Sequence, residues 1–205
     1  MTIEALKQFM LAMGPSTNTV SMEWDKIWAE NVDIIDPVSK WFNAIRDDTK
    51  VLLHISNLTE VPVGITVKYM QKNEALGKRV RLYNNTLFVE HSDLKGLNIG
   101  EKFTLREIGN VYIDSFEKDG EKIKTVTVTS HPEDRELKTT WKVCWVPADP
   151  ALHTIVNFIE YDQLITKPTI EEEDNLDDFL NHRSKVVTKF LAEKEVGTLN
   201  ENEFI

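Results

Sequence analysis

The sequence predicts a mainly β fold, in which antiparallel sheets close into one or two β-barrels after a helical start. Short runs of β-branched and aromatic residues recur from about residue 51 onward, and Gly, Asn and Asp turn signals separate them. Helical periodicity is concentrated before that point. Many short strands spaced by turns are typical of sheets that close into barrels, whereas alternating strands and helices would indicate a parallel sheet. We expect a helical linker over residues 1–48 and the barrel region over residues 49–205.

The first segment predicts an α-helix, because its apolar residues recur at spacings of three and four. These residues are Ile3, Leu6, Met10 and Met13. Gly14 and Pro15 follow directly and supply a C-terminal stop.

A second helix is expected after a polar turn. Ser21 can cap this helix, and Trp24 and Trp28 lie four residues apart on one of its faces. Pro37 prevents the helix from continuing past Ile35. We interpret the five tryptophans of the chain as core or domain-junction packing residues: Trp24, Trp28, Trp41, Trp141 and Trp145.

Short strands are expected next, over 51–55, 64–69, 79–83 and 86–90. Asn84 and Asn85 separate the last two strands, and we expect a turn there because asparagine tolerates positive φ. A clearer hairpin surrounds Asp119 and Gly120, with strands over 111–116 and 122–129. Polar and apolar residues alternate in the second of these strands, which predicts one wet face and one dry face.

The last third of the chain continues the β pattern with one interruption. An acidic loop leads into a short helix, whose first turn carries Asp177 and Asp178. Further strands are expected over 137–146, 153–165 and 203–205.

Composition indicates an ordinary soluble globular protein of 205 residues, with 41% hydrophobic and 28% charged residues. No apolar run approaches the ~20 residues that span a bilayer, and the N-terminus lacks the order of a signal peptide. Cys144 is the only cysteine, so no internal disulfide is expected, and its apolar neighbours favour a buried structural thiol. These features predict a cytoplasmic protein.

Charge is distributed unevenly along the chain. The net charge of −10 argues against non-specific binding to nucleic acid. Residues 66–106 nevertheless carry eight Lys/Arg against four Asp/Glu, whereas residues 160–205 carry five against twelve. This asymmetry is compatible with one basic face that binds RNA and, as the simpler alternative, with solvated surface strands.

The chain shows no pattern for catalysis of its own. Its glycines do not form a phosphate-binding loop, and its five histidines lack metal-ligand spacing. Asp177 and Asp178 are adjacent and cannot face each other as an acid–base pair. We expect no catalytic residue, no metal site and no cofactor in this chain.

Six segments carry a family resemblance: 6–10 (LKQFM), 14–18 (GPSTN), 22–28 (MEWDKIW), 35–38 (IDPV), 138–145 (KTTWKVCW) and 161–168 (YDQLITKP). In this order they resemble the C-terminal half of glutamyl-tRNA synthetases of the eukaryotic and archaeal type, including the Glu half of fused glutamyl–prolyl enzymes. The MEWDKIW block resembles the glutamate enzymes more than their glutaminyl relatives. The match is loose between residues 50 and 124.

The resemblance implies a helical linker and two β-barrels that bind the anticodon stem-loop of tRNA. It also implies a parent enzyme that uses ATP and Mg to attach glutamate to its tRNA, with the ATP-binding motifs upstream of Met1. This chain alone is then expected to be inactive, and its last strands to be truncated. The implied partner is glutamate tRNA, with other synthetases or scaffold proteins as further partners, and neither membrane nor DNA.

The resemblance also implies tRNA contacts at four residues: Arg106, Lys95, Asn73 and Asn31. Arg106 offers a bidentate contact to a guanine edge or a phosphate, and Lys95 offers a point charge. Asn73 falls near a stem contact of the family, and Asn31 lies at the junction of linker and barrel. Candidate stacking partners for unpaired bases are Tyr69, Tyr83 and Phe88.

Three other functions stay open. The acidic region at 171–178 and the tryptophan-bearing helix are compatible with a protein-interaction scaffold in a multi-synthetase assembly. The same barrels occur in glutaminyl-tRNA synthetases, whose equivalent module is a second alternative. A generic barrel that binds single-stranded RNA is the third.

Overall fold

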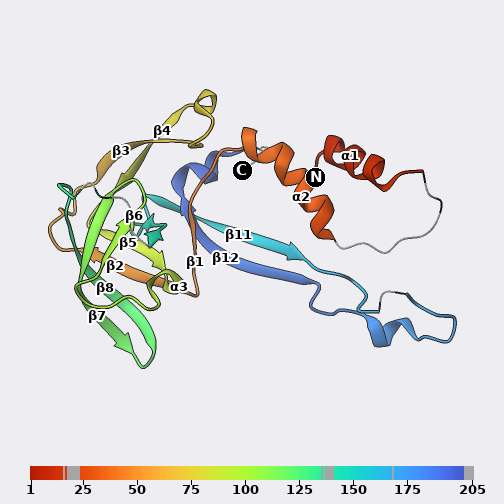
Figure 1. Ribbon diagram of the computed structural model, residues 1–205. Helices are drawn as coiled ribbons and strands as arrows, with labels where there is room; N and C mark the ends of the chain where they lie inside the picture. Colours follow the sequence, from red (N-terminus) through yellow and green to blue (C-terminus); the bar gives the residue numbers. More distant parts are fainter. Residues whose placement is uncertain (16, 18–23, 135, 137–140, 168, 201–205) are drawn as a thin grey trace.

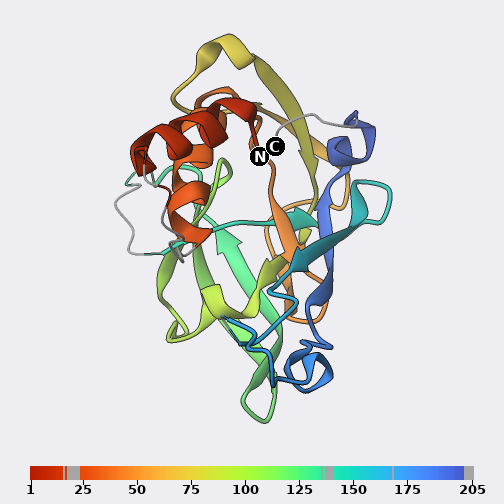
Figure 2. The same cartoon turned by 90° about the vertical axis from the view of Figure 1, so that its right-hand side faces the viewer.

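The computed structural model describes residues 1–205 except 16, 18–23, 135, 137–140, 168 and 201–205. The described part is mainly β, as predicted, with two helices set to one side of a curled sheet (Figure 1). A ribbon of β11 (His153–Tyr161) and β12 (Lys185–Glu193) extends away from the curled sheet. In the turned view, this ribbon and the helices lie on opposite sides of the linker that joins the helices to the sheets (Figure 2).

The two helices form an antiparallel pair at the start of the chain. Helix α1 (Ile3–Met13) begins at Thr2, whose side chain accepts a hydrogen bond from the Ala5 amide, and ends at Gly14, whose φ of 74° suits glycine. Helix α2 (Trp24–Ile35) is followed by a 3-10 turn, η1 (Asp36–Val38), which contains Pro37. Both helices and the proline stop are therefore confirmed, whereas Ser21, the expected cap, lies outside the described residues.

The largest sheet has seven strands in the order β10-β5-β2-β8-β7-β6-β9. Most neighbours are antiparallel, but β2–β8 and β6–β9 are parallel, so the sheet departs from a purely antiparallel barrel. The predicted hairpin at Asp119 and Gly120 is confirmed, and Gly120 takes a φ of 61° at the turn. The strands are β2 (Lys50–Ile55), β5 (Thr86–Glu90), β6 (Lys102–Leu105), β7 (Gly109–Asp119), β8 (Lys122–Ser130), β9 (Lys142–Val143) and β10 (Val146–Pro147).

A separate hairpin, formed by β3 (Val63–Lys68) and β4 (Lys78–Tyr83), corrects the turn expected at Asn84 and Asn85. Strands β4 and β5 do not pair, and neither asparagine has a positive φ. The physical reason is that Asn85 is tied to a third strand: its carbonyl accepts from the Ile55 amide at 2.8 Å. The two asparagines therefore carry the chain from the hairpin into the seven-stranded sheet. The hairpin turn lies instead at residues 69–77, which include η2 (Glu74–Leu76).

The third sheet has the order β1-β12-β11 and is antiparallel throughout. Strand β1 (Ala44–Arg46) lies within the segment expected as a linker, and β12 had no sequence prediction. The strand expected over 153–165 ends at Tyr161, and Ile165 forms only an isolated bridge with Leu180. The short acidic helix is confirmed as the 3-10 helix η3 (Leu176–Phe179), and a second 3-10 helix, η4 (Lys194–Thr198), follows β12.

The strand expected over 137–146 is only partly described. Residues 137–140 lie outside the described residues, as does the strand expected at 203–205. The remainder forms two short strands, β9 and β10, which pair with different neighbours. Between these strands, Cys144 is half-buried, and burial raises the pKa of its thiol. An unreactive thiol fits that environment.

The main core lies on one face of the curled sheet. Its strands alternate between buried and partly exposed residues, so that β2 buries Val51, Leu53 and Ile55 completely. Trp145 is also fully buried, and its ring centre lies 5.5 Å from that of Tyr83 with the two rings tilted, which agrees with its core interpretation.

For the other four tryptophans the core half of this interpretation is wrong, whereas packing at a domain junction stays a prediction. Between 40% and 59% of the surface of Trp24, Trp28, Trp41 and Trp141 is exposed. The physical reason on α2 is that α1 covers the face bearing Ile27 and Asn31, while Trp24 and Trp28 lie outside that contact. None of the described helices is long and apolar enough to span a membrane.

Candidate nucleic-acid interface

A polar groove of about 560 Å³ lies where the linker, the β3–β4 hairpin and the turn after β6 meet. It combines side chains from four segments that are far apart in the sequence. Cations, amides and aromatic rings all line it, and Glu107 is the one acidic residue among the lining residues that the structure describes. The lining residues are Trp41, Asn43, Lys68, Tyr69, Gln71, Arg79, Thr104, Arg106, Glu107 and Lys142.

Arg106 lies on a rigidly held turn at this groove. The β6–β7 register leaves a short turn between Leu105 and Gly109, in which Glu107 has a φ of 64°. A left-handed φ is uncommon outside glycine and marks a tightly determined backbone. The Arg106 amide donates to the Val143 carbonyl at 3.1 Å, and its carbonyl accepts from Trp145 Nε1 at 2.7 Å. The backbone of Arg106 is therefore fixed at both ends.

The Arg106 side chain is exposed and has no ion pair among the described residues. The charge of Arg106 also acts on Asp93. Burial raises the pKa of the Asp93 carboxyl, and the positive charge of Arg106 opposes that rise. A fixed backbone with an unpaired guanidinium is the arrangement that a phosphate or a guanine edge requires.

Lys142 extends the cationic side of the groove. Strands β6 and β9 are parallel, and their register sets Lys142 opposite Thr104. Lys142 is exposed and, within the described residues, makes no ion pair. Lys68 on the opposite wall is already paired with Glu74 at 2.5 Å. Among the described cations that line the groove, Arg106 and Lys142 are thus the two without an ion pair.

Trp41 supplies the exposed aromatic ring of the groove. Its amide donates to the Tyr69 carbonyl at 3.0 Å, which anchors its backbone, while 45% of its surface stays exposed. A tethered, half-exposed indole is a suitable stacking platform for an unpaired base.

Tyr69 has a different role from the stacking role expected of it. Its ring is flanked by the Lys40 ammonium at 5.2 Å and the Arg79 guanidinium at 5.0 Å, and by the edge of Phe42. Its hydroxyl donates to Glu195, and that hydrogen bond, followed by burial, raises the pKa of Tyr69 to about 12. The ring surfaces of Tyr69 are therefore used within the protein.

The other two stacking candidates also make protein contacts. Tyr83 is buried at 9% exposure against Trp145. Phe88 is half-buried between the Lys50 ammonium at 5.0 Å and the ring of His153. Neither residue lines the groove.

The structure does not bring the four predicted tRNA contacts together. Lys95 is exposed, but it follows α3 (His91–Leu94) and is not part of the groove lining. Asn73 caps η2 through the Ala75 amide at 3.1 Å and donates to the Pro37 carbonyl at 2.6 Å. Asn31 is 5% exposed and accepts from the Thr2 amide at 2.7 Å. Only Arg106 lines the groove.

Sequence reasoning missed Trp41 and Lys142 as groove residues. Trp41 had been assigned to packing because most tryptophans are buried. Lys142 lies between two apolar residues, Trp141 and Val143, and its alternation with the buried Val143 was the signal that its side chain points outward. Neither the tryptophan nor the alternation at Lys142 shows which strand lies next to β9, so the sequence pattern could not predict the groove.

Two family profiles match the chain, both described as "tRNA synthetases class I (E and Q), anti-codon binding domain". The first covers residues 42–131 and the second covers residues 142–205. Together they span most of the chain and include nine of the ten groove residues, Trp41 being the exception. The chain therefore belongs to the family of anticodon-binding domains of class I synthetases for glutamate and glutamine.

Similar proteins over the whole chain are glutamate–tRNA ligases. The chain is 31% identical over 206 residues to the "Probable glutamate--tRNA ligase, cytoplasmic" of Schizosaccharomyces pombe, and it covers 29% of that protein. It is 31% identical to the "Glutamate--tRNA ligase, cytoplasmic" of Saccharomyces cerevisiae, of which it covers 28%. It is 28% identical to the "Bifunctional glutamate/proline--tRNA ligase" of Drosophila melanogaster, of which it covers 12%. The chain thus spans less than a third of these relatives, and the resemblance read from the sequence is confirmed.

Proposed function

We propose that this chain recognises the anticodon stem-loop of glutamate tRNA as the reading module of a glutamate–tRNA ligase. The observation that carries the proposal is the groove, which Arg106 and Lys142, two cations without an ion pair among the described residues, line together with the exposed Trp41. A chain with a net charge of −10 otherwise repels phosphate. Cations next to a stacking surface form the combination that unpaired loop nucleotides bind.

The catalytic steps belong, in this proposal, to a larger parent protein. The parent attaches glutamate to tRNA with ATP and Mg, and this chain contributes binding and orientation alone. The names of the relatives support a ligase, and the word "cytoplasmic" in several of them supports the same location for the parent.

Three of the groove residues have distinct roles in this proposal. Arg106 binds a base edge or a phosphate through its planar fork, and Lys142 binds a phosphate as a point charge. Trp41 stacks on an unpaired base. Lys95, outside the groove, contacts a phosphate of the stem.

Asn73 and Asn31 act through the protein. Asn73 holds the tip of the β3–β4 hairpin against Pro37, and Asn31 holds the start of α1 against α2. Both roles are proposals drawn from their hydrogen bonds.

Binding of a labelled glutamate anticodon stem-loop tests the proposal. Fluorescence anisotropy over 50–300 mM salt is expected to show at least about tenfold tighter binding than to a stem-loop with a scrambled anticodon, a gap of roughly 1.4 kcal/mol. An unstructured RNA of the same length separates stem-loop recognition from generic single-strand binding. Equal affinity for all three RNAs would contradict the proposal.

A second role in protein binding is supported by the exposed rings of Trp24 and Trp28, which lie 6.3 Å apart on α2. Exposed aromatic pairs are typical of protein interfaces. If another synthetase binds here, the Trp24→Ala/Trp28→Ala variant loses co-purification with that synthetase but keeps its affinity for the stem-loop. Unchanged co-purification would remove this role.

A further inference from the structure

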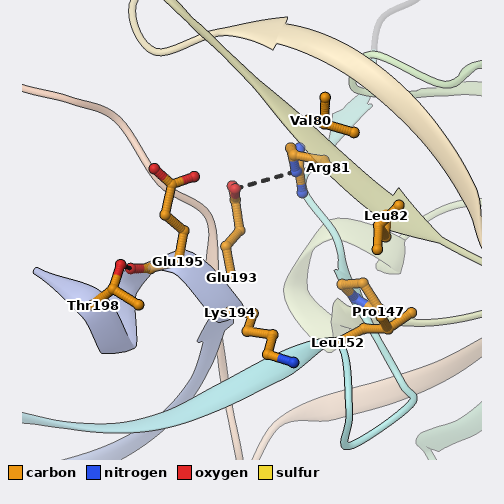
Figure 3. Close-up of a pocket in the computed structure, with 9 residues that line it drawn as sticks. All are labelled: Val80, Arg81, Leu82, Pro147, Leu152, Glu193, Lys194, Glu195 and Thr198. Atoms are coloured by element: carbon orange, nitrogen blue, oxygen red, sulfur yellow. Dashed lines mark hydrogen bonds and ion pairs between the residues drawn. The ribbon is translucent and has the colours of Figure 1, made fainter.

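A network of four charged side chains lies at the groove, and two of its members, Arg79 and Glu107, line the groove. Three of the four side chains are buried, whereas Glu107 is exposed. Arg79 and Arg81, from the inner face of β4, both reach Glu193 at the end of β12, and Arg81 also reaches Glu107. We call these four residues the latch. Figure 3 shows Arg81 and Glu193 pointing toward each other, and both line a second cavity of about 330 Å³.

Glu193 is the centre of the latch. One of its carboxylate oxygens accepts hydrogen bonds from the backbone amide of Asn43 at 2.8 Å and from Arg79 Nη2 at 2.9 Å. The other accepts from Arg79 Nε at 3.0 Å and lies 3.3 Å from Arg81 Nε. Glu193 is 5% exposed, so this carboxylate is satisfied entirely by protein donors.

The two arginines are equally well enclosed. Arg81 donates to Glu107 at 2.6 Å and to the Trp145 carbonyl at 3.0 Å, and its guanidinium lies 3.8 Å from the Trp145 ring centre. Arg79 lies 4.8 Å from the Phe42 ring centre. With two cations and two carboxylates, the latch is neutral.

The latch joins parts that the backbone leaves separate. The β3–β4 hairpin pairs with neither of the other sheets, and a two-stranded hairpin alone is only marginally stable. Glu193 belongs to the three-stranded sheet, whereas Glu107 and Trp145 belong to the unit of the seven-stranded sheet. Side chains of the latch therefore fix how the hairpin lies against both sheets.

A buried ionic network determines the arrangement of the parts it joins more than it stabilises the fold. Desolvation of the charges offsets most of their attraction, so such a network adds little net stability. Its directional hydrogen bonds nevertheless allow one arrangement, which an apolar contact would not enforce. The hairpin wall of the groove carries Lys68, Gln71 and Arg79, and the opposite wall carries Arg106 and Lys142.

We propose that Glu193 is a positioning residue for RNA recognition: through the latch it holds the hairpin wall of the groove at a fixed distance from Arg106 and Lys142. This inference rests on the proposed function for its RNA part. Its structural part, the position of the hairpin, is independent of RNA.

The first experiment measures the hairpin without RNA. Glu193→Gln removes the charge at nearly constant shape, and Glu160→Gln on β11 is the matched control, because Glu160 is exposed and lies outside the latch. Hydrogen–deuterium exchange is expected to speed up at least tenfold over residues 63–83 in Glu193→Gln, with protection of β7 and β8 unchanged. Arg79→Lys keeps the positive charge but removes the planar guanidinium that donates two hydrogen bonds to Glu193. This variant is measured in place of Glu193→Gln if Glu193→Gln does not fold. Unchanged hairpin exchange would overturn the inference.

The second experiment measures the stem-loop. Glu193→Gln is expected to weaken binding at least tenfold relative to Glu160→Gln, and to lower the slope of log Kd against log salt by about one, since fewer cations then act together. Loss of folded protein alone would lower the active fraction and leave the slope unchanged. A faster-exchanging hairpin with wild-type affinity and slope would overturn the inference. If the wild-type chain does not distinguish anticodons, the proposed function fails, and the exchange result still decides whether the latch positions the hairpin.

Discussion

Replacing Arg106 with alanine is the most direct test of the groove. The side chain is exposed and unpaired among the described residues, while its backbone is fixed by Val143 and Trp145. Alanine removes the guanidinium and keeps both backbone hydrogen bonds. The variant therefore changes what the groove offers to RNA without changing how the turn is held.

The expected magnitude follows from the contact that is lost. A bidentate arginine contact to a base contributes about 1–3 kcal/mol, which corresponds to a roughly 5- to 140-fold rise in Kd. A contact to phosphate alone weakens all RNAs uniformly and lowers the salt slope by about one. The free energy of unfolding should change by less than about 0.5 kcal/mol, because the exposed side chain makes no ion pair with the described residues.

Fluorescence anisotropy with the cognate and scrambled stem-loops, over a salt series, measures these effects. Arg106→Lys keeps the charge and loses the fork, so it restores binding if the contact is to phosphate but not if it is to a base. Lys118→Ala is the matched control: it is exposed at the far end of β7, about 30 Å along the strand from the turn. Its Kd should equal that of the wild type.

One result would refute this reasoning about Arg106. If Arg106→Ala binds the cognate stem-loop with wild-type affinity and wild-type salt slope, and remains folded by circular dichroism, Arg106 does not contact the RNA. The groove would then need another cation, and Lys142→Ala is the next variant.

Three further predictions follow from other parts of the structure. Trp41→Ala should weaken stem-loop binding by about 1–3 kcal/mol through lost stacking, and an unchanged Kd would exclude Trp41 as a platform. Phe103→Ala, at a fully buried position, should lower the free energy of unfolding by about 3–5 kcal/mol in urea denaturation, and a loss below about 1 kcal/mol would contradict the assigned core. Hydrogen bonds from Lys102 and the Glu136 amide hold the pKa of Asp134 at about 2, below its ordinary 3.8. The ionised carboxylate therefore stabilises the fold above pH 4, and this stabilisation is lost as pH falls from about 4 through 2. Asp134→Asn should be less stable than wild type at pH 6 and approach it near pH 2, whereas a constant difference would exclude this linkage.

Local elements were predictable because their signals are local. Gly14 and Pro37 mark the C-terminal ends of the two helices, and Gly120 marks the β7–β8 hairpin. Such residues act through their own φ, ψ or capping groups, so no tertiary information is needed. The turn expected at Asn84 failed, because its neighbours pair with other strands and a turn preference does not select partners.

The candidate site was predictable only in part. The family motifs identified the kind of protein, and Arg106 lines the groove, but its predicted contact with RNA stays a prediction. Asn31 and Asn73 were chosen by position in the chain, and the structure shows their amides used in hydrogen bonds to Thr2 and Pro37. Whether a polar side chain faces water or a neighbouring segment depends on contacts that are distant in sequence.

By itself, the sequence determined the β class, the helical start and the family, since these depend on periodicity, turn residues and motifs along one chain. The tertiary structure alone decided which side of β4 is buried. Alternation over this strand would send Val80 and Leu82 inward, yet they are 64% and 44% exposed, while Arg79 and Arg81 are 8% and 5% exposed. The physical reason is that Glu193, more than a hundred residues away, pairs with both arginines, and its carboxylate offsets the cost of burying their charges.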